Sequence, residues 1–300
     1  MVGDTFSKIR GIYSALITPM RADESVNFDA LKQIVRMQLE DGAEGFYCCG
    51  SSGEGLLLTI EERKRLVETV LGEVDGRVPV IAHVGTIRTG DAIDLARHAK
   101  SVGVDAVSMI PPYYYKFSMD EIIGYYEAVI KAVPGLSVII YNIPQFTGVS
   151  FSKDNAGRLL GNEAVAGIKH TSNDLFGLER MRCAYPDKVY FNGFDELFLS
   201  ALCAGADSAI GTTVNLYAST FKKIRGAFAA GDLAAGRRLQ SLTNRRVETL
   251  LKPGIFNAVK YGLTYRGVDC GSCRAPFKAL GEDDKRKLDV LFAEGFGCGE

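Results

Sequence analysis

Short runs of apolar residues alternate along this chain with stretches in which apolar positions recur every three or four residues. Runs of this kind, bounded by loop residues and too short for a core helix, are typical of buried strands. Eight are present, at residues 11–20, 45–49, 78–84, 106–110, 137–141, 164–169, 189–192 and 208–211. They follow one another at intervals of about 25 to 35 residues, the size of a strand-helix unit in a parallel sheet.

Amphipathic patterns between these runs predict helices at residues 28–40, 60–74, 90–101, 118–133 and 196–203. Gly42, Gly103 and Gly205 each precede a predicted strand. Glycine at the end of a helix adopts the left-handed conformation that turns the chain back. Thr59 and Glu62 fit the Thr-x-x-Glu capping box at the start of the second helix.

Eight strand-helix repeats without a long interruption favour a closed (β/α)8 barrel over an open, doubly wound sheet. We therefore expect a barrel over residues 1–230, with its active site at the carboxyl ends of the strands. Strand signals stop after about residue 230, and helical patterns cover residues 232–251, 254–266 and 281–294. We expect residues 231–300 to form a helical extension that packs on the barrel or builds an oligomer interface.

The composition is that of an ordinary globular chain, with 47% hydrophobic and 24% charged residues among 300. The 35 basic residues nearly cancel the 36 acidic residues, which argues against a nucleic-acid or membrane partner. The basic pairs at 222–223, 237–238 and 245–246 suit solvated helix faces. Residues 1–5 do not begin a signal sequence, and no apolar stretch is long enough to span a membrane, so we expect a cytoplasmic protein.

Seven cysteines, an odd number, fit a reducing compartment better than a disulfide framework. Cys48 and Cys49 lie within an apolar run and are expected in the core. Cys270 and Cys273 form a single CxxC motif with no second pair and no nearby histidine, which argues against zinc. The three histidines lack metal-ligand spacing, so no metal is expected.

The strongest candidate for chemistry is Lys169, which ends the apolar run 164–169. Burial disfavours the charged form of an amine, and the neutral amine is the form that attacks a carbonyl. Lys169 is therefore a Schiff-base candidate. Tyr141 ends the preceding predicted strand, where a phenol could carry a proton beside the amine. Alternatively, Lys169 extends from a strand end to solvent and Tyr141 is packing.

Four loops at the carboxyl ends of predicted strands add candidates. The glycine-rich segment 49–55 can aim backbone amides at an anion, although it could also be a plain connection. Residues 111–117 place three tyrosines after two prolines, of which at least one should project from the rim. Asp195 and Glu196, followed by the hydroxyl-rich segment 211–215, suit a ligand rich in hydroxyl groups. A helix N-terminus is the alternative explanation for these two acids.

Taken together, Gly-Ser-Ser-Gly-Glu at 50–54, Tyr-Asn-Ile-Pro at 141–144 and Gly-Ile-Lys-His-Thr-Ser at 167–172 resemble the pyruvate-dependent class I aldolases of the dihydrodipicolinate synthase and N-acetylneuraminate lyase superfamily. The order and spacing match over nearly the whole chain. The resemblance implies a (β/α)8 barrel with C-terminal helices, a homotetramer made of two tight dimers, and no cofactor other than the covalent imine.

The same resemblance implies roles for individual residues. Lys169 forms the imine with pyruvate, and Tyr141 shuttles the proton. Ser51 and Ser52 bind the pyruvate carboxylate, and Ser51 also helps to poise Tyr141. Tyr114 corresponds to a tyrosine contributed across the dimer interface, although Tyr113 and Tyr115 are adjacent alternatives.

Within the superfamily the chain is similar to the lyase branch. Synthases carry an arginine two residues after the Tyr-Asn-x-Pro proline, where it binds a second carboxylate, and this chain has Phe146 there. The lyase branch implies sugar-acid contacts from Thr171, Gly193, Asp195, Glu196 and Thr212. Departures from its pattern are Ser52 in place of threonine, Thr212 in place of serine, Pro111 before Pro112, and His170 after the lysine.

The resemblance thus implies reversible cleavage of N-acetylneuraminate to N-acetylmannosamine and pyruvate. A second interpretation is another pyruvate-dependent aldolase of the superfamily, such as a 2-keto-3-deoxy sugar acid aldolase or 4-hydroxy-tetrahydrodipicolinate synthase. A third is a catalytically silent barrel that binds pyruvate or a sugar acid. Retention of both Lys169 and Tyr141 argues against the third.

Overall fold

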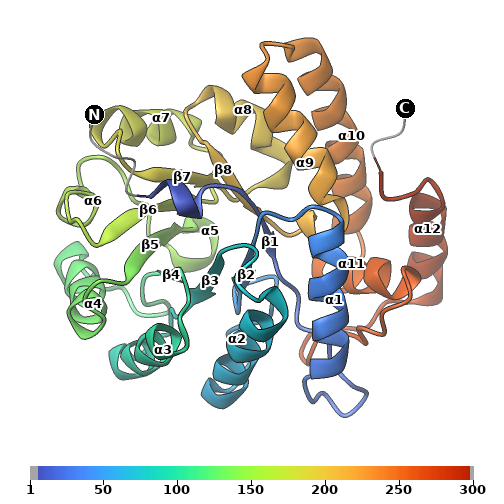
Figure 1. Cartoon of the computed structure of the whole chain (residues 1–300), viewed down its shortest axis with the longest axis horizontal. Coiled ribbons are helices and arrows are strands. Elements are labelled where there is room, and N and C mark those ends of the chain that lie inside the picture. The colour runs from blue at the N-terminus through green and yellow to red at the C-terminus, as the bar shows by residue number, and fades with distance from the viewer. Residues whose placement is uncertain (1–5, 298–300) are drawn as a thin grey trace.

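Eight short strands pair in parallel and in chain order, and the last pairs with the first to close a barrel (Figure 1). The computed structural model describes residues 6–297. The strands are β1 (Ile12–Ala15), β2 (Gly45–Cys48), β3 (Val80–His83), β4 (Ala106–Met109), β5 (Ser137–Asn142), β6 (Val165–His170), β7 (Val189–Asn192) and β8 (Ser208–Gly211). The predicted (β/α)8 fold is confirmed.

Helices follow the strands and surround the barrel (Figure 1). They are α1 (Phe28–Glu40), α2 (Ile60–Val74), α3 (Thr89–Val102), α4 (Met119–Ala132), α5 (Pro144–Thr147), α6 (Gly157–Leu160), α7 (Leu175–Ala184), α8 (Phe198–Cys203) and α9 (Val214–Ala229). The capping box of Thr59 and Glu62 is present at α2. Gly42, Gly103 and Gly205 all have positive φ angles, as predicted.

The first strand is shorter than the run that predicts it. Residues 16–20 are buried but leave the ladder after Leu16, whose amide still donates to the carbonyl of Tyr47 at 3.1 Å. Thr18 and Pro19 follow, and proline has no amide hydrogen for a ladder. The apolar run therefore continues as a buried loop rather than a strand, because burial alone does not determine backbone pairing.

Three further helices complete the described chain: α10 (Leu233–Leu251), α11 (Ile255–Tyr265) and α12 (Glu282–Ala293). They lie on one side of the barrel, with α10 beside α9 (Figure 1). Leu250, Leu263 and Leu288 belong to the same hydrophobic cluster as the outer faces of the strands. The C-terminal helices therefore share the barrel's core. The division at residue 230 stays a prediction.

Two sequence predictions extend beyond the described residues. The lack of a signal sequence concerns residues 1–5, and the predicted extension includes residues 298–300; both stretches lie outside the part that the structure describes. Within residues 6–297, none of the helices combines the length and the apolar character needed to cross a membrane.

Candidate active site

A cavity of about 190 Å³ opens at the carboxyl ends of the strands. Parallel strands that close into a barrel bring these ends together, which is why distant sequence motifs meet there. Nine of the ten predicted site residues line the cavity: Ser51, Ser52, Tyr141, Lys169, Thr171, Gly193, Asp195, Glu196 and Thr212. Tyr114 is not among the lining residues.

The lysine of the site comes from β6 and is 4% exposed. The ladder pairs Lys169 directly with Tyr141 of β5, so the predicted neighbours are adjacent. The Lys169 Nζ lies 4.0 Å from the ring centroid of Tyr141 and 4.4 Å from that of Tyr47. Contact with the faces of two rings restricts the side chain and holds its amine in place. The alternative in which Lys169 extends to bulk solvent is therefore wrong.

Tyr47, His83 and Tyr141 form an aromatic wall around the amine, with ring centroids 6.0 to 6.2 Å apart. Tyr47 is fully buried and shares a 3.1 Å hydrogen bond with Ser108 Oγ. Burial, and then the proximity of Tyr141, raise the pKa of Tyr47 well above its usual value, so its phenol stays neutral. Sequence reasoning missed Tyr47 and His83, because an aromatic residue within an apolar run gives no sign of which partner it will face.

A buried arginine lies behind this wall. Arg63 of α2 donates to the carbonyl of His83 at 2.7 Å and to that of Gly85 at 3.3 Å. Burial first, and then the charges of Arg63 and Lys169, lower the pKa of His83 well below its usual value. His83 is therefore a neutral ring at ordinary pH, and it adds no positive charge beside the amine.

The glycine-rich segment forms a tight turn beside the amine. The amides of Gly53 and Gly55 both donate to the carbonyl of Gly50, at 3.1 and 3.0 Å. A Cβ at Gly53 would lie 2.7 Å from the carbonyl oxygen of Leu16, so only glycine fits there. Ser52 Oγ shares a 2.7 Å hydrogen bond with Thr212 Oγ1. The turn thus places Ser51 and Ser52 on the cavity wall.

Thr171 and Gly193 lie side by side on another part of the cavity wall. Gly193 donates its amide to the carbonyl of His170 at 2.9 Å, and a Cβ at this position would overlap the Thr171 hydroxyl. Among the described residues, Thr171 Oγ1 is buried without a hydrogen-bond partner. A buried hydroxyl of this kind is costly unless paired, which makes it a natural contact for a bound ligand.

The position of Asp195 is compatible with both of the explanations that the sequence left open. It begins a short 3-10 helix at Asp195–Leu197, and its Oδ2 accepts the amide of Thr213 at 2.7 Å. It also lines the cavity together with Glu196. Burial raises the pKa of Asp195 to about 6, against the opposing effect of the Thr213 hydrogen bond.

This shift predicts a specific pH dependence of stability. In the unfolded chain Asp195 ionises near pH 4, whereas in the folded protein it ionises near pH 6. Folded-state stability is therefore lost as the pH rises through this window and is constant above it. Relative to Asp195→Asn, the free energy of unfolding of the unsubstituted protein should fall by on the order of 2 kcal/mol between pH 4 and 6.5. Urea titrations at both pH values measure this, and parallel behaviour of the two proteins would contradict it.

Tyr114 lies apart from the cavity. Its side chain is 86% exposed, and its φ of +76° is unusual for a residue other than glycine. Tyr115 is 64% exposed and packs edge-on against it at 5.1 Å between ring centroids. The prediction that at least one tyrosine projects from the rim is confirmed. Within the single chain, no role in the cavity follows for Tyr114.

The remaining wall was not predicted. Val247 and Leu251 of α10, together with Ile255 and Phe256 of α11, cover one side of the cavity. The amphipathic pattern predicts these helices but not which barrel end they cover. Within residues 6–297, no group of three or more histidine, cysteine, aspartate or glutamate side chains is arranged to hold a metal ion.

Comparisons with known proteins agree on one family. The model of the Dihydrodipicolinate synthetase family matches residues 8–294. N-acetylneuraminate lyase of Rhizobium meliloti (strain 1021) is 42% identical over 281 residues, covering 94% of this chain and 93% of the relative. The enzyme of the same name from Enterobacter sp. (strain 638) is 38% identical over 285 residues, covering 95% and 96%.

Solved structures give the same result. CdNal from Clostridium difficile in complex with mannosamine superposes with a TM-score of 0.93 at 35% identity, covering 95% of this chain and 99% of the other. N-acetylneuraminate lyase from Fusobacterium nucleatum complexed with pyruvate has a TM-score of 0.91 at 36% identity, covering 95% and 97%.

Proposed function

We propose a function from the premise that this chain belongs to the dihydrodipicolinate synthetase family. The chain is a Schiff-base lyase that reversibly cleaves N-acetylneuraminate to N-acetylmannosamine and pyruvate. Relatives and solved structures that bear the name N-acetylneuraminate lyase support this reaction. The observation that carries the mechanism is the Lys169 amine, enclosed by aromatic rings and open to the cavity.

The bond cleavage follows from the chemistry of an amine beside a phenol. Lys169 Nζ attacks the C2 ketone of the open-chain sugar acid, water leaves, and a protonated imine forms. The Tyr141 hydroxyl then accepts the proton of the C4 hydroxyl while it passes its own proton to the substrate carboxylate. The C3–C4 bond breaks, and its electron pair passes into the imine to give an enamine. N-acetylmannosamine departs as the aldehyde. Protonation of the enamine and hydrolysis of the resulting imine release pyruvate and restore Lys169.

The rest of the cavity wall orients the substrate. The turn carrying Ser51 and Ser52 holds the carboxylate through backbone amides and hydroxyls. Thr171, Gly193, Asp195, Glu196 and Thr212 hold the polyol, with the unpaired Thr171 hydroxyl as one ready contact. Fixing both ends of the substrate places C2 at the amine, which lowers the entropic part of the barrier. The lysine supplies the electron sink, so no separate cofactor is needed.

A lyase fits the cavity better than a synthase does. Of the side chains that line it, within the described part of the chain, Lys169 is the only basic one. Phe146, also on the wall, occupies the position at which a synthase would present an arginine. A substrate with a second carboxylate would therefore lack a cationic partner.

Pyruvate release from a panel of 2-keto acids tests the proposed reaction. Coupling to lactate dehydrogenase reports pyruvate directly, and N-acetylneuraminate is expected to give the highest kcat/KM. A higher value for a 2-keto-3-deoxy sugar acid would assign the chain to another aldolase of the family. Absence of turnover with every substrate would favour a silent binding barrel.

Glu196→Ala should separate sugar binding from pyruvate chemistry. Glu196 is half-buried on the polyol side, and losing hydrogen bonds to a carboxylate weakens binding by about 1.5 to 3 kcal/mol. The KM for N-acetylneuraminate should rise at least about tenfold, while pyruvate is still trapped on Lys169 with unchanged half-saturation. Glu248→Ala, an exposed acid of α10, is the matched control. If Glu196→Ala weakened N-acetylneuraminate turnover and pyruvate trapping equally, Glu196 would have a structural role rather than a role in sugar binding.

We further place the protein in the cytoplasm as a homotetramer, a dimer of dimers. The described cysteines Cys48, Cys49, Cys183, Cys203, Cys270 and Cys273 are all free, which suits a reducing compartment. The exposed Tyr114 and Tyr115 suit burial at the dimer contact, where Tyr114 would reach the partner's cavity. Light scattering of the purified protein measures the assembly, with a mass of four chains expected.

A further inference from the structure

Glu54, the last residue of the Gly-Ser-Ser-Gly-Glu segment, points away from the substrate cavity. Its carboxylate forms an ion pair with Lys260 of α11, with Oε1 and Nζ 2.5 Å apart and both side chains fully buried. Lys260 also donates to the carbonyl of Ser272 at 3.0 Å. A buried charge without its partner is strongly destabilising, so each of these two charges requires the other.

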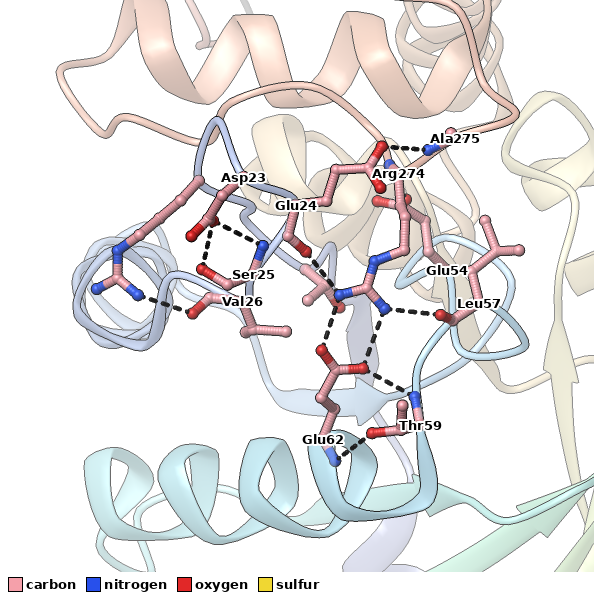
Figure 2. A network of polar contacts seen from close by, with 12 residues as sticks. Asp23, Glu24, Ser25, Val26, Glu54, Leu57, Thr59, Glu62, Arg274 and Ala275 are labelled. Atoms are coloured by element: carbon pink, nitrogen blue, oxygen red, sulfur yellow. Dashed lines mark hydrogen bonds and ion pairs between the residues drawn. The ribbon is translucent and has the colours of Figure 1, made fainter.

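Arg274, in the segment that follows α11, makes further contacts with the same turn and with the residues just after it. The backbone amide of Arg274 donates to Glu54 Oε2 at 2.7 Å, and its guanidinium donates to the carbonyl of Leu57 at 2.7 Å. That guanidinium also binds both carboxylate oxygens of Glu62, at 2.7 and 3.0 Å. Figure 2 shows Arg274 between Glu24, Leu57 and Glu62, with Glu54 next to it. The C-terminal segment thus holds the turn at its C-terminal end, at Glu54 and Leu57.

Backbone hydrogen bonds connect Glu54 to the serine part of the turn. Its amide donates to the carbonyl of Ser51 at 3.1 Å, and its carbonyl accepts the amide of Leu57 at 2.8 Å. Its φ of +56° lies in the left-handed region that side chains disfavour. An external contact must therefore hold Glu54 in this conformation, and the ion pair with Lys260 is such a contact.

We propose that Lys260 is a positioning residue for the reaction: through its buried ion pair with Glu54 it fixes the turn so that Ser51 and Ser52 bind the pyruvate carboxylate. The inference rests on the proposed function and extends it to the C-terminal helices, which thereby determine carboxylate affinity. Lys260 itself does not line the cavity and touches no substrate.

The test measures how strongly pyruvate is trapped on Lys169 by borohydride as the pyruvate concentration is varied. Lys260→Met leaves Glu54 charged and buried, so a large loss of stability is expected. The double variant Lys260→Met with Glu54→Gln removes both charges and should recover most of the melting temperature. Its half-saturation for pyruvate should still be raised about tenfold, because the turn has lost its anchor.

Three further variants keep the test decisive. Arg266→Met removes another contact between α11 and the barrel, the ion pair with Asp41 at 2.9 Å, and should leave pyruvate half-saturation unchanged. Arg274→Met removes the partly exposed guanidinium contacts with Leu57 and Glu62 and should raise the half-saturation for pyruvate about threefold. If the double variant does not fold, Glu54→Gln alone decides the matter, because it removes the ion pair with Lys260 and keeps an acceptor for the Arg274 amide.

The outcomes separate the inference from the function on which it rests. If the double variant or, failing that, Glu54→Gln traps pyruvate as tightly as the unsubstituted protein, Lys260 only stabilises the fold and the inference is overturned. If the unsubstituted protein forms no adduct at all, the proposed function itself fails. A double variant with a recovered melting temperature but a raised half-saturation for pyruvate supports the positioning role. If Lys260 had only a structural role, the double variant would recover both the melting temperature and the half-saturation of the unsubstituted protein.

Discussion

Lys169→Ala is expected to lower turnover of N-acetylneuraminate by a factor on the order of 10⁴ or more, because it removes the covalent route altogether. The amine is the only basic group that lines the cavity in the described residues, so no neighbouring lysine can replace it. Pyruvate release in the coupled assay measures the loss. Melting temperature should change little or rise, since the substitution removes a costly buried amine.

Lys188→Ala is the matched control for this substitution. Lys188 is equally enclosed, with a side-chain exposure of 4%, but it precedes β7 at the opposite end of the barrel and donates to the carbonyl of Asn162 at 3.1 Å. Its loss should lower stability and leave kcat within about threefold, because a group remote from the cavity adds little transition-state stabilisation. If Lys188→Ala abolished turnover and Lys169→Ala did not, the nucleophile would be misassigned.

Tyr141→Phe should give the second largest effect, a fall in kcat on the order of 10² to 10⁴, which is the usual contribution of a positioned general acid or base. The ring remains, so the contact with Lys169 at 4.0 Å and the packing of the wall are kept. Pyruvate should still be trapped as the imine, since only the proton carrier is lost. Single-turnover measurements distinguish slow bond cleavage from slow imine formation.

Tyr13→Phe is the matched control for Tyr141→Phe, because it also removes one buried tyrosine hydroxyl. Tyr13 of β1 is also fully buried inside the barrel, but its hydroxyl donates to the carbonyl of Ile9 at 2.8 Å, away from the cavity. Removing that hydrogen bond should cost about 1 kcal/mol of stability with little effect on kcat. If Tyr13→Phe lowered kcat as much as Tyr141→Phe does, both losses would be explained by a disturbed fold rather than by a missing proton carrier.

The sequence predicts the fold well because the barrel depends on local, repetitive signals. The run ending at Lys169 and the run ending at Tyr141 both predict strands, and consecutive strands in such a barrel are neighbours. That the two strands are neighbours therefore follows from the pattern, whereas the register that pairs Tyr141 with Lys169 also depends on an irregularity between Val138 and Ile139. The capping box at Thr59 and the glycines predicted after three helices, at 42, 103 and 205, are equally local, and the structure confirms them.

The unpredicted parts depend on contacts between residues far apart in the chain. Nothing in the periodicity of α11 indicates that Lys260 would face Glu54 rather than solvent, since a lysine usually lies at the surface. Likewise, the apolar residues Leu251 and Phe256 predict helix packing but not a cavity wall. Tyr114 remains a prediction, because its proposed role requires a second chain.

The central claim is that the Lys169 amine forms the imine with the substrate ketone. The most direct measurement is reduction by borohydride in the presence of pyruvate, followed by mass mapping of the modified peptide. We predict one added pyruvate-derived group per chain, located on Lys169 and missing from Lys169→Ala. An adduct on any other lysine, or its persistence in Lys169→Ala, would contradict the account.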